Sequence, residues 1–99
     1  MPKLPDLDPV IHGKVRLAIL SILAGAEEAD FTYLRDQLDT TDGNLSVHLS
    51  KLEKARYIAV RKRFIDKRPN SAYRMTEKGR QAFADYVQAV KALLGQQLR

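Results

Sequence analysis

Residues 45–80 read LSVHLSKLEKARYIAVRKRFIDKRPNSAYRMTEKGR, and three structural patterns follow one another in this stretch. From Leu45, leucines recur at i, i+4 and i+7, which is the spacing of one face of a helix. Residues 57–64 are rich in aromatic and β-branched side chains, and residues 71–75 have the composition of a returning strand. Thr76 stands where the cap of a further helix is expected. The stretch therefore predicts a helix, a β-hairpin and a second helix.

The chain before this stretch predicts two more helices. Apolar residues at helical spacing indicate a helix over about 9–24, with Asp8 as its cap and a proline in its first turn. After an acidic connection, Phe31 is expected to be extended, and Thr32 is expected to cap a short helix that ends near residue 38.

Residues 39–42 are expected to form a tight turn, from which the leucine-bearing helix runs to about Ala55–Arg56. Arg56 should then be left-handed, at a cost that glycine would avoid. Residues 66–70 are expected to form the hairpin turn, and the last helix should reach about residue 97. The order is α-α-α-β-β-α, mainly α with a small hairpin and a long C-terminal helix, which is the winged helix-turn-helix arrangement.

Composition restricts the class of protein. The 99 residues suffice for one domain, which we place at 8–99 behind a flexible arm of residues 1–7 that contains two prolines. The chain has no cysteine, which excludes disulfides and thiolate metal sites. No apolar run approaches the ~20 residues of a membrane span. We expect a cytoplasmic protein without membrane contact.

Positive charge is concentrated in one part of the chain. Residues 56–80 carry nine cations and two anions, a net charge of +7, whereas the remaining residues carry eight cations and ten anions, a net charge of −2. Together they give the overall +5. A cationic hairpin beside a helix with an open polar face suits a phosphate backbone, so the sequence favours binding to double-stranded DNA.

In a helix-turn-helix, the third helix enters the major groove with the face opposite its buried stripe. We expect base or phosphate contacts from two sets of residues. Opposite the leucines lie Asn44, Val47, His48 and Lys51, and at the end of the helix that enters the groove lie Thr40, Thr41 and Gly43. The alternative is that Thr40, Thr41 and Asp42 only cap the helix and that Asn44 is a solvated surface residue. An anion at this edge repels phosphate, so we expect Asp42 to cap.

The hairpin supplies the second set of candidate contacts. Lys67 and Arg68 at the tip can reach an adjacent minor groove, and Arg61, Arg63 and Arg74 lie along the stem near phosphates. The alternative is a basic edge that prevents pairing with other chains. That alternative leaves the lack of balancing acids unexplained.

The sequence shows no catalytic set, so we expect neither an enzyme nor a cofactor. His12 and His48 are the only histidines, and they lie on different predicted helices without a nearby carboxylate pattern, so no metal site is predicted. His48 is expected to hydrogen-bond a phosphate or a neighbouring side chain.

Three segments resemble the small winged-helix transcriptional regulators of the MarR/ArsR type: VRLAILSIL (15–23), NLSVHLSKLEKARYI (44–58) and YRMTEKGRQAF (73–83). The resemblance covers about 8–95 and is closest to short regulators without a separate effector domain. It implies that Ser46 and His48 form the S-x-H pair of the recognition helix. It also implies a homodimer on an inverted-repeat operator, with two recognition helices in successive major grooves. The chain departs from these families in two ways. Arg56 stands where they usually have glycine, and the cysteine-rich sequence of their metal sensors is missing.

The terminal helices are expected to form the dimer interface. An apolar stripe as long as that of the last helix exceeds what one small core covers, so a partner helix is expected; the alternative is packing onto the first helix. The interface residues are predicted to be Ile11, Val15, Phe83, Tyr86, Val87, Val90, Leu93 and Leu94. A competing hypothesis makes the fold a protein-interaction module of a larger assembly. The sequence does not name an operator or a small-molecule effector.

Overall fold

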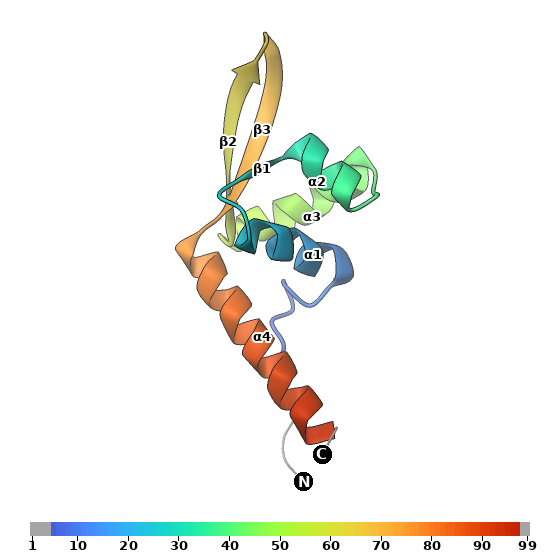
Figure 1. The fold of residues 1–99 in the computed structure, drawn as a ribbon, viewed down its shortest axis with the longest axis vertical. Helices are drawn as coiled ribbons and strands as arrows, with labels where there is room; N and C mark the ends of the chain where they lie inside the picture. The colour runs from blue at the N-terminus through green and yellow to red at the C-terminus, as the bar shows by residue number, and fades with distance from the viewer. Residues whose placement is uncertain (1–4, 98–99) are drawn as a thin grey trace.

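The computed structural model describes residues 5–97, and in Figure 1 a helical body lies between a long hairpin and a long last helix. The elements are α1 (Lys14–Ala24), β1 (Ala29–Asp30), α2 (Phe31–Gln37), α3 (Asp42–Lys54), β2 (Ile58–Ile65), β3 (Arg68–Met75) and α4 (Glu77–Gln97). The strands form one antiparallel sheet in the order β1-β3-β2. This is the predicted winged helix-turn-helix.

The core is built on the leucine stripe of α3. Leu45, Leu49 and Leu52 are at most 1% exposed, and they belong to one hydrophobic cluster with side chains of α1, α2 and the sheet. Burial of each such side chain stabilises the fold by about 1.5–3 kcal/mol. Because this stripe is buried completely, the orientation of α3 about its own axis is fixed, and its opposite face points outward.

The hairpin is longer than the sequence predicted. Its turn contains only Asp66 and Lys67, with φ of 50° and 66°, instead of the predicted residues 66–70. Two central residues with positive φ are the geometry that matches the twist of a two-residue hairpin. Pro69 is therefore a strand residue opposite Phe64. It lies beyond the pairing of β1 with β3, so its missing N–H breaks no ladder bond on that side.

The first helix starts later than predicted. Asp8 does cap, but it caps a separate turn: its carboxylate accepts from the amide of Val10, and its carbonyl accepts from the amides of Ile11 and His12. Gly13 is then extended, and α1 begins only at Lys14. Residues 1–4 of the expected arm lie outside the described residues, while Leu7 packs against the core.

The start of α2 also differs from the prediction. The extended segment is Ala29–Asp30 rather than Phe31, which is already helical. Asp30, not Thr32, is the cap, because its Oδ1 accepts from the amide of Tyr33 at 2.8 Å. Asp30 also pairs with Ala72 in the sheet, and this tertiary contact sets where the helix begins.

Arg56 and Thr76 behave as predicted, and together they join α3 to α4. Arg56 has a φ of 65°. Thr76 caps α4 by accepting from the amide of Gly79 at 3.0 Å, and its hydroxyl donates to the carbonyl of Arg56 at 2.6 Å. The amide of Thr76 donates to the carbonyl of Tyr57 at 3.0 Å. A Cβ on Gly79 would lie 2.0 Å from that same carbonyl oxygen, so only glycine permits this approach.

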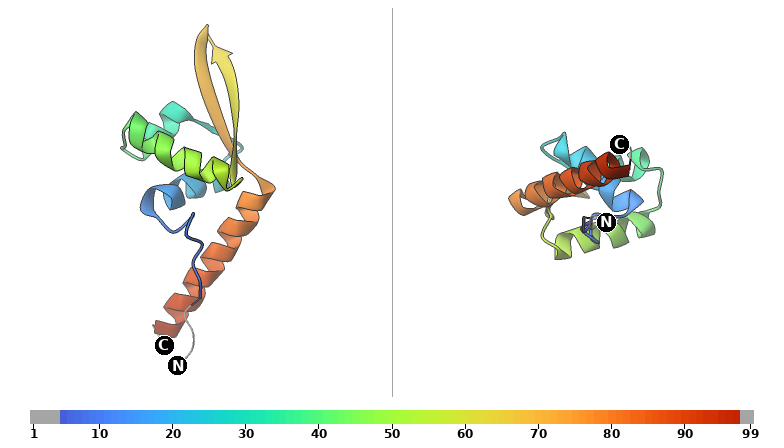
Figure 2. Two further views of the ribbon diagram at one scale, coloured as in Figure 1. Left: turned by 180° about the vertical axis from the view of Figure 1, so that it is seen from behind. Right: turned by 90° about the horizontal axis from the view of Figure 1, so that it is seen from below.

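The contacts of Arg56 and Tyr57 with Thr76 and Gly79 form the joint between α3 and α4. From this joint α4 leads away from the body, on the side opposite the hairpin tip (Figures 1 and 2). The molecule measures 59 × 26 × 21 Å, and its radius of gyration is 15.2 Å. A compact domain of this length has a radius near 13 Å. Within residues 5–97, no helix is long and apolar enough to cross a membrane.

The first prediction concerns the joint. Gly79→Ala should destabilise the fold by about 3 kcal/mol or more, because the new methyl group overlaps a backbone oxygen that cannot move alone. Gly95→Ala is the matched control, since a Cβ there meets nothing within 4 Å. The control should gain about 0.5–1 kcal/mol from helix propensity. Urea unfolding at a fixed protein concentration measures both, and equal midpoints for the two variants would contradict the assignment.

Candidate nucleic-acid interface

The outward face of α3 carries most of the predicted contact residues. Gly43, Asn44, Ser46, Val47 and Lys51 are exposed, and Val47 keeps 53% of its area accessible although it is apolar. Thr40 and His48 are half-buried at the edge of this face. The face is thus open to solvent, and it combines amide, hydroxyl, methyl and ammonium groups that suit base edges and phosphates.

The entering end of α3 is ordered by its own side chains. Thr41 is the cap, because its hydroxyl accepts from the amide of Asn44 at 3.2 Å. The side-chain amide of Asn44 donates to the hydroxyl of Thr40 at 2.8 Å. Thr41 therefore has a structural role, and the exposed Asn44 keeps a side-chain carbonyl oxygen that can accept hydrogen bonds.

The expectation that Asp42 caps α3 was wrong. Asp42 is the first residue within the helix, and its carboxylate pairs with Arg35 of α2 at 2.9 Å. Arg35 also pairs with Asp36 at 3.2 Å. The hydrogen bond with Asp42 is the main reason that the pKa of Arg35 is raised. The negative charge of Asp42 at the start of α3 is thus paired with Arg35, and this ion pair links α2 to α3.

Gly43 has no structural need to be glycine. It lies within α3, and a Cβ built there would have no heavy atom within 4 Å. A glycine in a helix costs about 0.5–1 kcal/mol relative to alanine. Gly43 thus differs from Gly79, whose missing side chain the fold requires.

His48 is held by Arg16 of α1. The guanidinium donates to His48 Nδ1 at 3.0 Å, which leaves the ring proton on Nε2. Burial lowers the pKa of His48, and the charges of Arg16 and Lys51 lower it further. His48 is therefore a neutral donor on the rim of the α3 face. His48 was expected to bond a phosphate or a neighbouring side chain, and in the structure its partner is the side chain of Arg16.

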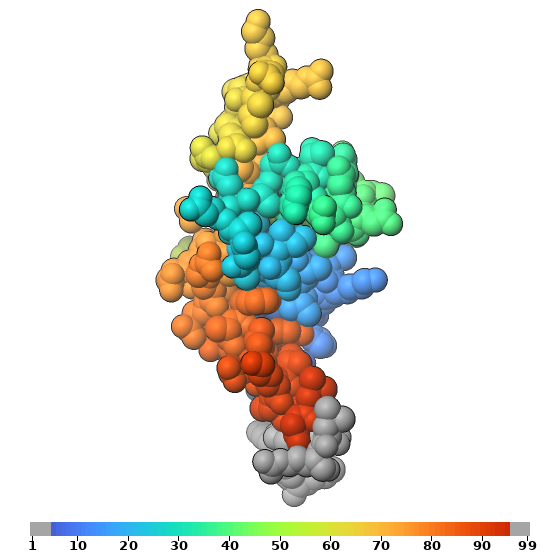
Figure 3. Space-filling model, viewed as in Figure 1, coloured from blue at the N-terminus to red at the C-terminus, as the bar shows by residue number. Residues whose placement is uncertain are grey.

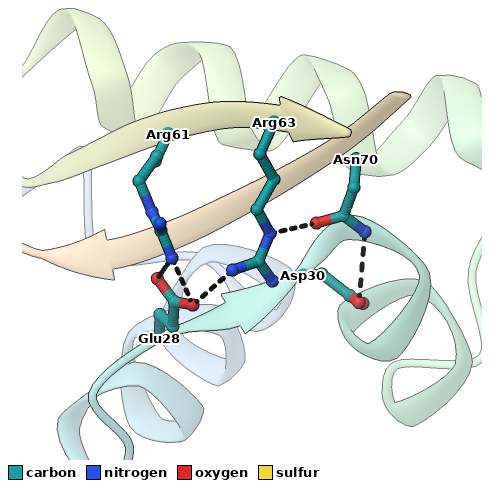
Figure 4. Close-up of polar contacts among 5 residues, drawn as sticks. All are labelled: Glu28, Asp30, Arg61, Arg63 and Asn70. Carbon is teal, nitrogen blue, oxygen red and sulfur yellow. Dashed lines mark hydrogen bonds and ion pairs between the residues drawn. The ribbon is translucent and has the colours of Figure 1, made fainter. Parts of the chain in front are cut away.

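The stem arginines of the hairpin are paired with an acid that the sequence gave no reason to expect. Glu28 accepts from Arg61 at 2.9 Å and from Arg63 at 3.0 Å (Figure 4). Arg63 also donates to Asn70, whose amide reaches Asp30. The hydrogen bond from Arg61 is the main cause that lowers the pKa of Glu28. The statement that the hairpin lacks balancing acids was wrong for its stem.

The tip of the hairpin keeps its positive charge. Lys62, Lys67 and Arg68 are exposed, and within residues 5–97 none of them forms an ion pair. Arg74 is exposed nearer the base of β3. In the space-filling view the tip stands clear of the helices (Figure 3). The structure thus separates Arg61 and Arg63, which share one carboxylate, from exposed cations without an ion pair in the described residues: Lys62 and Arg74 on the stem, and Lys67 and Arg68 at the tip.

The predicted dimer residues divide into two groups. Ile11 is fully buried in the core of the single subunit, and Tyr86 is 8% exposed with its hydroxyl 2.9 Å from His12 Nδ1. These two side chains have little area to offer a partner. The second group is accessible. Its half-buried members are Val15, Phe83, Val87, Val90 and Leu93, and Leu94 is 50% exposed.

Sequence reasoning missed the residues that act by holding others in place. Arg16, Glu28 and Arg35 each pair with a residue of another element. Within residues 5–97, no three His, Asp or Glu side chains gather as a metal site would require.

The fold and the open helical face define a winged helix DNA-binding domain. The profile of the winged helix DNA-binding domain family matches residues 15–94, and the chain belongs to that family. The chain is also similar to Uncharacterized protein MJ0432 of Methanocaldococcus jannaschii, with 38% identity over 84 residues that cover 85% of this chain and 91% of the relative.

Two solved structures are similar to this one. The transcriptional regulator homologue of Pyrococcus horikoshii OT3 has a TM-score of 0.82 and 27% identity, over 89% of this chain and 87% of that one. ZitR of Lactococcus lactis, a zinc-responsive MarR family member, has a TM-score of 0.64 and 21% identity, over 86% of this chain and 58% of that one. The predicted winged-helix resemblance is confirmed: the family match shows a winged helix DNA-binding domain, and the likeness to ZitR shows the fold that a MarR family member shares with it.

The second prediction concerns His48. Its folded pKa lies below the ordinary 6.5, so the stabilisation from the neutral ring is complete above pH 6.5 and is lost as the pH falls through the folded pKa. Titration followed by ¹⁵N-edited NMR should give a midpoint below 6.5 and the proton on Nε2. Arg16→Ala should raise the midpoint part of the way towards 6.5, because burial remains. A wild-type midpoint at or above 6.5 would refute the arrangement.

Proposed function

We propose that this protein is a transcriptional regulator that binds double-stranded DNA as a homodimer. In the proposed complex, α3 lies in the major groove and the hairpin contacts the backbone and the adjacent minor groove. Two subunits then meet two half-sites of an inverted repeat, about one helical turn apart. The observation that carries the proposal is the open face of α3, which is polar and accessible. The opposite face, formed by Leu45, Leu49 and Leu52, is buried in the core.

Gly43 and Asn44 support major-groove contact. The missing side chain of Gly43 leaves space that no atom of this subunit uses, at the end of α3 that would enter the groove. Asn44 presents an amide, which can bond adenine through two hydrogen bonds. Their position allows the helix backbone to approach base edges closely.

The free cations of the hairpin tip support backbone contact. Lys67 and Arg68 are exposed at the turn, whereas Arg61 and Arg63 are engaged by Glu28. Neutralising phosphates releases counterions, so the affinity depends on how many cations are free for DNA. We propose that the tip, not the stem, supplies most of the salt-sensitive affinity.

The shape of α4 supports dimerisation. Its first half is anchored by Tyr86, which contacts His12, whereas its outer part leads beyond the body and leaves Leu94 exposed (Figure 1). An apolar stripe along a projecting helix is stabilised when a second copy covers it. We propose that α4 pairs with the same helix of a second subunit.

The third prediction separates a DNA contact from a structural role at Gly43. Gly43→Ala should stabilise the folded protein by about 0.5–1 kcal/mol through helix propensity. The same variant should bind duplex DNA about tenfold more weakly, since a steric cost near 1.4 kcal/mol corresponds to one decade. Thermal unfolding and fluorescence anisotropy with a labelled duplex measure the two effects. Unchanged affinity in a stabilised variant would remove Gly43 from the interface.

The competing hypothesis, a protein-interaction module, gives a different result in the same assay. A module has no duplex affinity that falls steeply with added salt. Wild-type protein that does not bind DNA at any salt concentration would favour the module and refute the regulator.

The fourth prediction concerns the dimer. Leu94→Asp should leave the subunit folded, because half of that side chain is already exposed. It should shift the protein from dimer to monomer by placing a charge in an apolar interface. Sedimentation velocity over a concentration series measures the change, with Gln88→Asp as a control at an exposed position of the same helix. A variant that stays dimeric would show that α4 does not form the interface at Leu94.

A further inference from the structure

The tip of the hairpin is apolar as well as cationic. Phe64 is 76% exposed and Ile65 is 45% exposed, and Pro69 is exposed on the facing strand. Phe64 is the most exposed of the large apolar side chains in the described part of the chain. Single exposed apolar residues are ordinary, but Phe64 and Pro69 share one face at the end of a projecting ribbon, and Ile65 lies beside them on the opposite face.

The register places Phe64 and Pro69 side by side. They are direct partners in the β2–β3 ladder, next to the Ile65–Arg68 pair that closes the turn. Because the closing pair of a two-residue hairpin is hydrogen-bonded, the Phe64–Pro69 pair is of the non-bonded kind, in which side chains are closest. The two rings thus form one apolar edge rather than two separate groups.

The same face of the ribbon leads from this edge into the core. Side chains alternate along a strand, so Val60, Lys62 and Phe64 share one face, and Val60 packs against the core. Lys62 lies between the core and the edge and is exposed. At the other end of the edge, the turn contains Lys67 and one exposed anion, Asp66, and Arg68 begins β3. Free cations therefore lie on both sides of the apolar edge.

We infer that the Phe64–Pro69 edge is an apolar wedge that enters the minor groove and unstacks a base step while the flanking cations hold the two phosphate strands. This inference rests on the proposed function and adds a contact to it. Phe, Ile and Pro are among the side chains that proteins insert between base steps, and such insertion kinks the duplex towards the major groove. Charge complementarity selects DNA as the occupant, because an apolar patch meant for a second protein copy would gather like charges at the contact.

The wedge gives the protein a way to read sequence without hydrogen bonds at the ends of its site. Pyrimidine–purine steps are the easiest to unstack, so DNA with such a step under each hairpin costs less energy to deform. We therefore expect a preference for TA or CA steps outside the half-sites that α3 contacts. This preference depends on Phe64 and not on Arg68.

The experiment uses full-length protein and a 40-base-pair duplex carrying the sequence that the wild-type protein selects from a random pool. Donor and acceptor dyes at the two ends report bending, and anisotropy reports affinity across a salt series. Phe64→Ala should lose the bend and bind about tenfold more weakly with an unchanged salt slope. Phe64→Leu, which keeps an apolar wedge, should retain the bend. Arg68→Ala should keep the bend and reduce the salt slope by about 1.

The outcomes separate this inference from the function on which it rests. If the wild-type protein selects no duplex, the proposed function fails. If it binds and bends DNA and Phe64→Ala does both equally well, the wedge is refuted while the regulator stands. If Phe64→Ala alters the oligomeric state in sedimentation without DNA, the tip is a protein contact and the wedge is also refuted. Circular dichroism of Phe64→Ala should match the wild type, because the side chain makes few contacts within the subunit.

Discussion

The approach of α4 to the carbonyl of Tyr57 is the constraint on which the shape of this protein depends. Gly79 allows that approach, and Thr76 holds it through hydrogen bonds to the chain that leaves α3. The joint connects α3, which has the open face, to α4, which carries the apolar stripe. In a dimer built on α4, the spacing of two α3 helices would follow from its angle, so a backbone contact far from DNA would set the spacing of the half-sites.

Internal pairing decides which charges remain available at the surface. Glu28 pairs with two stem arginines, Arg35 pairs with the carboxylate of Asp42, and Arg16 donates to the ring of His48. Pairs at exposed positions are individually weak, so their main effect is on orientation rather than on stability. What they leave is a hairpin in which Arg61 and Arg63 share the single carboxylate of Glu28, and a tip that is both cationic and apolar. A count of charges along the sequence could not make that distinction.

Local chemistry predicted the fold well and the site only in part. The leucine period, the left-handed Arg56 and the cap at Thr76 depend on near neighbours in sequence, and the structure confirms all three. Tertiary contacts decided the rest. Asp30 caps α2 at the point where it joins the sheet, and Arg61 meets Glu28 across 33 positions. No periodicity or composition reports a contact between residues so distant in the chain.

The most direct test of the account is a chemical-shift map of ¹⁵N-labelled protein titrated with duplex DNA. Amide signals should move at two places, residues 40–51 and the hairpin residues 62–69. Signals of residues 22–27, at the end of α1 and in the connection that follows it, should stay where they are. Shifts confined to that connection or to α4, with the α3 face and the hairpin tip unaffected, would contradict the assignment of the binding surface.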